Sequence, residues 1–374
     1  MIRLYYKCLM SASIAAQDDL KALGAEIDAV RRRIEAQIGA EDVRTVKRLS
    51  AFSRGLEVAG RLLIHFSIEP ISFGLGVLSL AAHKQLHSSE IGHAVLHGAY
   101  DKLPGAGRFQ SKGYWWESPI DEEAWHEGHN IAHHQYTNIA GKDPDCEYGM
   151  IRLTEHIEHK KVNRHQAWQA LWVWPTFTFN MSAHFSGIID VYTRKEADYT
   201  VLKDDSKASR RKAHRRWLRK LVPYYSKEFV LFPALAGPMF WKVALGNALA
   251  EAVRSTYTAA TIFTGHVGED TASYPEGTKA TSRAHWYLMQ IEAANNFEVP
   301  KFMSVLCGGL DYQIEHHLFP KWPPNRLRQV APEIRDICAR HGVRYQTGSW
   351  STMLRRVFRR LKTLSEPTPI GDVV

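Results

Sequence analysis

The stretch GGLDYQIEHHLFP, Gly308 to Pro320, contains two adjacent histidines, His316 and His317, directly before an apolar turn. Neutral imidazole is a common ligand of iron, zinc, copper and nickel, so such a pair indicates a metal site. Three residues upstream stands Gln313, where a metal-binding cluster would more naturally carry a third histidine. The interpretation of this stretch therefore depends on the other histidines of the chain.

Two earlier segments contain histidines at the spacing of metal ligands. In EIGHAVLH, His93 and His97 are four residues apart, so they share one face of a helix. In WHEGHNIAHH, His129 and His133 have the same spacing and His134 follows directly. Neighbours on an α-helix point about 100° apart, so an adjacent pair serves two metals more naturally than one. Because a single zinc ion needs only about three or four ligands, these groups together predict at least two metals.

Other histidines of the chain are less suitable. His83 and His87 are also four apart, but on a continuous helix His83 would lie about 15 Å before His93, at about 1.5 Å per residue. Both pairs cannot line one compact site. Glu90 favours the later pair, because a carboxylate one turn away can orient a ligand imidazole. His126 is a reserve ligand, an orienting residue or a surface histidine.

Composition narrows the class of protein. The 374 residues include 19 histidines, and the formal net charge is +9. The four cysteines are far apart and form no CxxC pair, which argues against thiolate zinc sites, iron–sulfur clusters and a disulfide framework. This pattern favours a reducing, cytoplasmic working face. The basic residues cluster beside apolar segments, which suggests a membrane face as readily as nucleic acid.

Several apolar stretches predict an all-α integral membrane protein with about four transmembrane helices and a cytoplasmic helical cap. The mean hydropathy of −0.31 fits a few spans that carry large regions outside the membrane. The first stretch is long enough to span a bilayer but is interrupted by charge and proline, so we expect a short, kinked hairpin there. The four stretches are Leu56–Ala82, Trp168–Val191, Phe229–Leu249 and Ala250–Val267.

The topology has two alternatives, because all histidine groups must reach one side of the membrane. This requires an even number of crossings between His134 and His316. In the preferred arrangement, residues 168–191 lie at the interface and residues 229–267 form a transmembrane hairpin. The basic run Arg194–Lys220 then stays cytoplasmic, as the positive-inside rule expects. In the alternative arrangement, residues 168–191 span the membrane, residues 229–267 return through it once, and the basic run lies on the non-cytoplasmic side.

Three segments are expected along the chain. Residues 1–50 form an amphipathic N-terminal helical extension, and residues 51–345 form the domain that carries the histidines. Residues 346–374 form a basic amphipathic helix and tail. The helix, Trp350 to Leu361, places apolar residues on one face and arginines on the other. Such a helix lies on an anionic lipid surface or docks on the protein core.

The three histidine groups together resemble the histidine boxes of the membrane fatty-acid desaturase family, in the form HxxxH, HxxxHH and QxxHH. The words HNIAHHQYTN, GKDPD and GGLDYQIEHHLFP are similar to the branch that includes front-end acyl-lipid and acyl-CoA desaturases. The resemblance covers roughly residues 55–345. It implies that these histidines ligate two iron ions and are catalytic: His93, His97, His129, His133, His134, His316 and His317.

The resemblance also bears on three other positions. Relatives place a further ligand after the last transmembrane helix, which here is His266 in FTGHVGED. The front-end branch has glutamine where Gln313 stands, so the amide supports membership. Gln313 can ligate iron directly, act through water or only donate a hydrogen bond. Asp311 departs from the family, in which asparagine is commoner, so the charge beside the site is open. Gln313, Glu90 and Asp311 are the expected cofactor-binding residues beyond the histidines.

The implied reaction is the O2-dependent removal of two vicinal hydrogens from a long acyl chain, carried as acyl-CoA or acyl-lipid. The tail is expected in an apolar tunnel, with Trp115, Trp116 and Trp125 as tunnel or core residues. The chain has no His-Pro-Gly-Gly word and no GxGxxG word. Electrons are therefore expected from a separate ferredoxin- or flavin-type reductase.

Two alternative functions are a hydroxylase or epoxidase with the same irons, and a membrane protein that binds metal without redox turnover. We expect no nucleic-acid partner.

Overall fold

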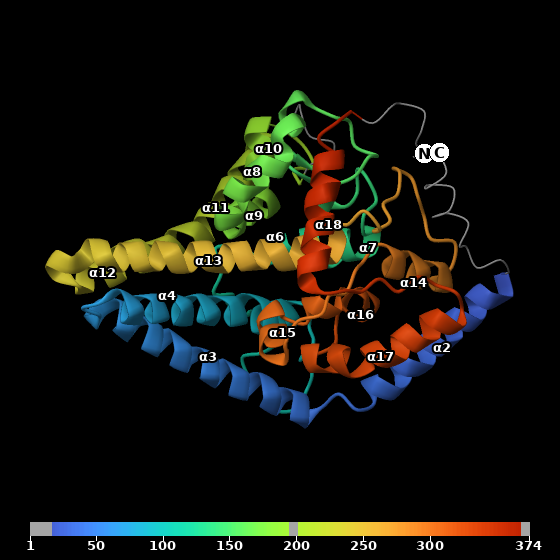
Figure 1. Ribbon diagram of the computed structural model, residues 1–374, viewed down its shortest axis with the longest axis horizontal. Helices are drawn as coiled ribbons and strands as arrows, with labels where there is room; N and C mark the ends of the chain where they lie inside the picture. Colours follow the sequence, from blue (N-terminus) through green and yellow to red (C-terminus); the bar gives the residue numbers. More distant parts are fainter. Residues whose placement is uncertain (1–16, 194–200, 368–374) are drawn as a thin grey trace.

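The computed structural model describes residues 17–193 and 201–367. Parts of the predicted N-terminal extension, of the basic run and of the C-terminal tail lie outside these residues. The described chain is mostly helical, as predicted, with one short antiparallel pair of strands. Its helices form two long hairpins and a cap of shorter helices (Figure 1).

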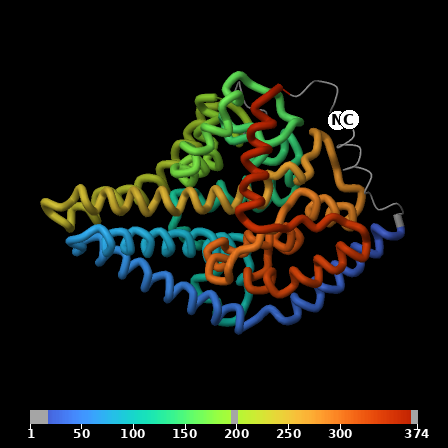
Figure 2. Tube along the Cα trace, viewed as in Figure 1, coloured from blue at the N-terminus to red at the C-terminus, as the bar shows by residue number. Residues whose placement is uncertain are grey.

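The two hairpins turn at the same end of the molecule (Figure 2). The first consists of α3 (Ala40–Phe66) and α4 (Pro70–Gln85). Glu69 begins α4, because its carboxylate accepts hydrogen bonds from the backbone N–H groups of Ile71 and Ser72, both at 2.6 Å. The second hairpin runs through α11 (Lys207–Ser226), η7 (Lys227–Leu231), α12 (Phe232–Leu235), η8 (Gly237–Met239) and α13 (Phe240–His266).

Small residues allow α3, α4 and α13 to pack closely. A Cβ atom added to Gly60 would lie 2.8 Å from the backbone nitrogen of Leu80, and one on Gly246 would lie 2.7 Å from Ile64. Ile64 and Leu80 are fully buried between the helices.

Among the described residues, no helix combines the length and the apolar character of a membrane span.

The cap covers the other end of the hairpins. Helix α2 (Gln17–Glu35) packs on α14 (Arg283–Glu292) and on α17 (Pro324–Arg340), and the apolar face predicted for residues 17–50 forms part of this core. The buried cluster contains Leu23, Ile27, Val30 and Ile34 from α2. Helices α15 (Lys301–Cys307) and α16 (Gln313–Leu318) complete this side, with the turn η9 (Leu310–Tyr312) between them.

The C-terminal helix α18 (Trp350–Thr363) docks on the protein core. Met353, Val357 and Leu361 are buried in two clusters that contain aromatic side chains, so this apolar face is not free to lie on lipid. It contacts α13 and a lobe of short elements. The lobe contains η3 (Pro144–Cys146), β1 (Glu147–Tyr148), β2 (Ile151–Arg152), η4 (Lys161–His165), α8 (Gln166–Val173), η5 (Trp174–Thr176), α9 (Phe177–Ser186) and α10 (Ile188–Thr193).

Both early histidine groups lie on helices that widen into π-helical turns. Helix α4 continues through η1 (Leu86–His93) into α5 (Ala94–Leu96). Likewise α6 (Glu122–Trp125) continues through η2 (His126–His133) into α7 (His134–Tyr136). Such segments are rare and are found mostly at functional sites. The wider turn changes the directions of the side chains from those of the α-helix that the sequence pattern assumed.

The third group enters the site through two glycines, Gly308 and Gly309, which have φ values of 74° and 75°. Glycine adopts this left-handed conformation without the steric cost that a Cβ atom usually brings. A Cβ on Gly308 would also lie 2.6 Å from Cβ of Ser89. The pair therefore permits a sharp turn at the end of α15 and brings the following helix, α16, against η1.

Candidate metal centre

Four buried histidines form the first group: His93, His97, His129 and His316. The Nε2 atom of His93 lies 3.1 Å from Nε2 of His129 and 3.0 Å from Nε2 of His97. The ring of His316 lies 4.7 Å from that of His93, centroid to centroid. Segments from three distant parts of the chain thus place their ring nitrogens around one point.

The second group consists of His133, His266 and His317, all buried. The Nε2 atoms of His266 and His317 are 3.0 Å apart. The ring of His133 lies 4.7 Å from that of His266 and 5.0 Å from that of His317. His266 is the last residue of α13, so the end of this long helix brings an imidazole to the site.

The adjacent pairs are divided between the groups. His316 belongs to the first and His317 to the second. His134 lies between them: its Nε2 is 3.3 Å from Nε2 of His129, while its ring stacks on His317 at 4.4 Å. The π-helical turn brings His134 to the same side as His129 and His133, although an α-helix would have turned it away.

Hydrogen bonds on the far side of the second group fix the direction of each ring. Nδ1 of His133 donates to Asp143 at 3.0 Å, and Nδ1 of His317 donates to Oε1 of Gln290 at 2.9 Å. Nδ1 of His266 faces the carbonyl oxygen of Ala293 at 3.3 Å. In a neutral imidazole a donating Nδ1–H leaves the lone pair on Nε2, so each of the three rings in its neutral form directs an acceptor nitrogen inward.

Burial keeps most of these imidazoles neutral. It lowers the pKa of His93 to about 3, and it lowers the pKa values of His97 and His129 well below their usual range. His133 differs. Burial alone would lower its pKa, but the carboxylates of Asp143 and Asp145 outweigh that effect and raise it to about 9. A cation at Nε2 would take the place of that proton.

The donor set fits metal ions. Two nitrogen ligands about 2.0–2.1 Å from one ion lie about 2.9–3.4 Å apart at angles between square and tetrahedral. The Nε2 separations of 3.0–3.3 Å match this range. Nε2 of His266 and of His317 carry no proton in these tautomers, so they cannot bond to each other. In the described residues, the buried Nε2 atoms of His133 and His316 have no hydrogen-bond partner. Bound cations would satisfy all four atoms.

Gln313 reaches the second group. Its side-chain amide lies 2.6 Å from Nε2 of His266. The amide packs over Gly265, where an added Cβ would lie 2.9 Å from Cγ of Gln313. The oxygen and nitrogen of an amide are assigned by their surroundings, so either can face the centre. The geometry makes Gln313 part of the same cluster as the histidines.

Glu90 and Asp311 bond to other partners. Glu90 forms a two-point ion pair with Arg328 at 2.8 and 2.9 Å, so its carboxylate turns to Arg328 and not to His93. The carboxylate of Asp311 accepts from the hydroxyl of Ser304, and burial raises the pKa of this group to about 6. Arg328 also donates a hydrogen bond to the hydroxyl of Ser304. Glu90, Arg328 and Ser304 therefore connect η1 to α15. They support the segments that carry the histidines.

A family model for fatty acid desaturases matches residues 70–349. The chain belongs to the fatty acid desaturase family. An NADPH-dependent stearoyl-CoA 9-desaturase from Mycobacterium tuberculosis is 32% identical over 93% of this chain and 81% of its own length. An sn-1 linoleoyl-lipid 6-desaturase from Synechocystis is 29% identical over 73% of this chain and 74% of its own. An acyl-lipid 8-desaturase from Rebecca salina is 27% identical over 78% of this chain and 61% of its own length.

The desaturase site includes residues that the sequence analysis did not assign. Asp143 stands in the quoted word GKDPD, and its carboxylate also accepts from the backbone N–H groups of Asn138 and Asp145 at 2.7 and 2.8 Å. Nothing in the local pattern around Gln290 marks it, because its partner His317 is 27 residues away. Thr137, four residues after His133, donates to the same amide.

The histidines set aside from the desaturase site lie elsewhere. His83 is bonded to Ser53 on α3, and His126 is exposed on η2. The three tryptophans have different positions. Trp116 and Trp125 line a cavity beside the histidines. Trp115 lies outside this cavity, and Nζ of Lys220 is 3.7 Å from the centroid of its ring.

Proposed function

We propose that this desaturase inserts a double bond into a long acyl chain at a centre of two iron ions. His93, His97, His129, His134 and His316 would hold one ion, and His133, His266 and His317 the other, with Gln313 beside it. The convergence of two buried groups of ring nitrogens carries this proposal. Iron in such a site supplies the activation of O2 that removal of unactivated hydrogens requires.

The chain's own residues hold the histidine rings and the acyl chain in place and exclude water. Asp143 and Gln290 fix the rings of His133 and His317, which prevents reorganisation during turnover. The apolar cavity beside the histidines positions the acyl chain and keeps water away. Two hydrogens leave the acyl chain and, with two electrons and two protons from outside, reduce O2 to two waters.

An acyl-CoA is the favoured substrate and NADPH the favoured source of electrons. One relative, which matches 93% of this chain, is named an NADPH-dependent stearoyl-CoA 9-desaturase. We propose that the electrons reach the irons through a separate reductase, because this chain carries neither a GxGxxG word nor a cytochrome-type His-Pro-Gly-Gly word.

We also propose that the hairpin end of the molecule inserts into a bilayer, with the histidines on the cytoplasmic side. Large apolar side chains are exposed where the hairpins turn, including Ile68 at 99% and Leu235 at 69%. Contiguous exposed apolar surface favours lipid contact. Helix α13 has 27 residues, about 40 Å at about 1.5 Å per residue, whereas a hydrocarbon core is about 30 Å thick.

Fatty-acid profiling of cells that express the chain with a reductase partner tests the activity. Wild type is expected to produce a new unsaturated acyl species, two hydrogens lighter than its precursor. His133→Ala and His316→Ala, one from each group, are expected to lose it, while His126→Ala is expected to keep it. A product that gains oxygen would favour the hydroxylase alternative. Equal products from wild type and both histidine variants would refute the proposal.

Membrane insertion has its own test. The protein is expected to stay with membranes after an alkaline carbonate wash, and release into the supernatant would contradict insertion. Protease should reach residues 210–220 from the cytoplasmic side. Cleavage there only from the opposite side would reverse the proposed orientation.

A further inference from the structure

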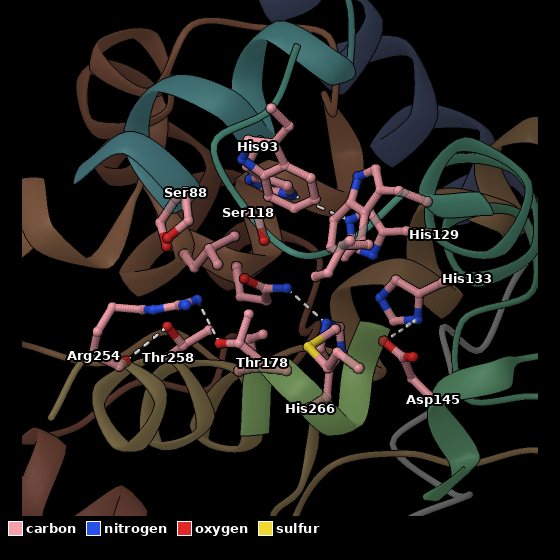
Figure 3. Close-up of a pocket in the computed structure, with 18 residues that line it drawn as sticks. Ser88, His93, Ser118, His129, His133, Asp145, Thr178, Arg254, Thr258 and His266 are labelled. Carbon is pink, nitrogen blue, oxygen red and sulfur yellow. Dashed lines mark hydrogen bonds and ion pairs between the residues drawn. The ribbon is translucent and has the colours of Figure 1, made fainter. Parts of the chain in front are cut away.

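A narrow cavity leads from the histidines into the interior of the hairpins (Figure 3). Its wall is largely apolar and includes Trp116, Ile120, Trp125, Met181, Ile262 and Leu310. Ser88, Thr178, Thr258 and Arg254 line the end away from the histidines (Figure 3). An apolar passage that opens at a metal centre and ends in polar side chains on its far side is what a chain-shaped apolar ligand with a defined stopping point would require.

The direction of the cavity follows helix α13. Arg254, Thr258, Ile262 and His266 all line it and stand four residues apart, so they form one stripe along the helix. Twelve residues separate the ends of this stripe, which is about 18 Å at about 1.5 Å per residue. The cavity is therefore long in one dimension.

Arg254 closes the far end as a fixed group. It is 2% exposed, and its guanidinium donates to Glu251, to the hydroxyl of Thr178 and to the hydroxyl of Tyr224. Lys84 lies behind it, 3.2 Å from Glu251 and 3.1 Å from Glu228. Removing one partner from a buried charge network is costly, so this end resists displacement by a ligand.

The charges also decide the direction of the acyl chain. A carrier such as CoA is large and charged, and burying it behind Arg254 would require unpaired charges in the interior. The methyl end must therefore enter the cavity and the carrier must remain outside. This step rests on the proposed desaturase function.

We propose that Arg254 is the floor of the acyl cavity and that the distance from it to the histidines limits the methyl-side length of the substrate. An extended chain gains about 1.2 Å per bond, from about 3.3–3.6 Å per three-bond residue. With about 4 Å of contact distance at each end, the stripe leaves room for roughly eight bonds beyond the reacting carbons. Arg254 and Thr258 are thus specificity-determining residues.

The test raises the floor by one helical step. Thr258 lies four residues nearer to the histidines, so Thr258→Phe is expected to shorten the cavity by about 6 Å, which is about five bonds. Thr258→Leu makes a smaller change and serves if the phenylalanine variant does not fold. Val253→Phe adds the same bulk on the exposed face of α13 and is the matched control.

Each variant receives acyl-CoA substrates of graded length with NADPH and a reductase. Iron content and product double-bond position are measured alongside turnover. The Thr258 variants are expected to lose at least tenfold in turnover of the longest substrate while retaining a shorter one, with the control unchanged. An unaltered length profile, or equal loss at every length in iron-loaded protein, would overturn the inference. Absence of any desaturation by wild type would instead refute the proposed function.

Discussion

At the scale of single residues, the contact between Asp143 and His133 matters most for the second group of histidines. Asp143 is fully buried and receives two backbone N–H groups in addition to the imidazole. Its orientation is therefore set before any metal binds. The same carboxylate both selects the tautomer of His133 and makes its inner nitrogen more basic.

Replacing Asp143 by asparagine is expected to weaken iron binding at the second group by about tenfold to a hundredfold. The amide removes the charge that stabilises an imidazole bound to a cation. Iron titration of purified protein measures this affinity. Asp336→Asn, on the exposed face of α17, is the control and should bind iron as wild type does. Wild-type affinity in both variants would show that Asp143 has no influence on the centre.

The grouping of the histidines was predictable from their spacing and, for His266, from the resemblance to the family. All eight histidines named from the sequence as metal ligands lie in the two groups or between them. Glu90 was chosen because it is one turn from His93, yet its carboxylate turns to Arg328, 238 residues later. Proximity along a helix does not reveal which distant cation competes for a carboxylate.

At the scale of elements, the close contact of α3 and α4 depends on glycines. A methyl group on Gly60 would meet the backbone of Leu80 at 2.8 Å and that of Gly76 at 3.0 Å. Backbone atoms cannot move aside as a flexible side chain can. Gly74, on the same hairpin, has open space around it.

We expect Gly60→Ala to lower the free energy of unfolding by about 1–3 kcal/mol through overpacking. Gly74→Ala should be neutral or stabilising by up to about 1 kcal/mol, because alanine is the better helix former. Denaturant unfolding of both variants in detergent gives the comparison. Equal stabilities would mean that the hairpin tolerates separation at this contact.

Helix α18 leads to a similar prediction. Leu361 is fully buried and packs in the same cluster as Trp174 and Phe263. Leu361→Ala is expected to cost about 2–5 kcal/mol in unfolding free energy. Arg355→Ala, on the exposed face, should change it by less than about 0.5 kcal/mol. A small effect of Leu361→Ala would contradict docking of α18 as an integral part of the core.

The elements themselves were partly predictable. The amphipathic patterns predicted in residues 1–50 and from Trp350 to Leu361 correspond to helices α2 and α18, and both helices pack inward. Period and charge alone could not decide whether α18 covers lipid or protein, since either surface suits an apolar face. The π-helical turns η1 and η2 were not predictable, because nothing in the local sequence distinguishes a widened turn from an α-helical one.

At the scale of the molecule, the two hairpins and the cap place four distant segments around one centre. The histidines of η1 and η2 come from the N-terminal half, and those of α13 and α16 from the C-terminal half. The need for convergence could be predicted from the sequence. The path by which the chain brings these segments together could not be predicted, because it depends on the glycine turn before α16 and on the side chains between helices.

We propose that the two groups of histidines hold two irons that together carry out one desaturation. Purified protein loaded with iron, supplied with reductant, O2 and a long-chain acyl-CoA, tests it in one experiment that measures metal content and product together. We predict about two irons per chain, one for each group, and an acyl product that has lost two hydrogens. Stoichiometric zinc without O2 consumption, or turnover that persists in His133→Ala and His316→Ala protein, would contradict the claim.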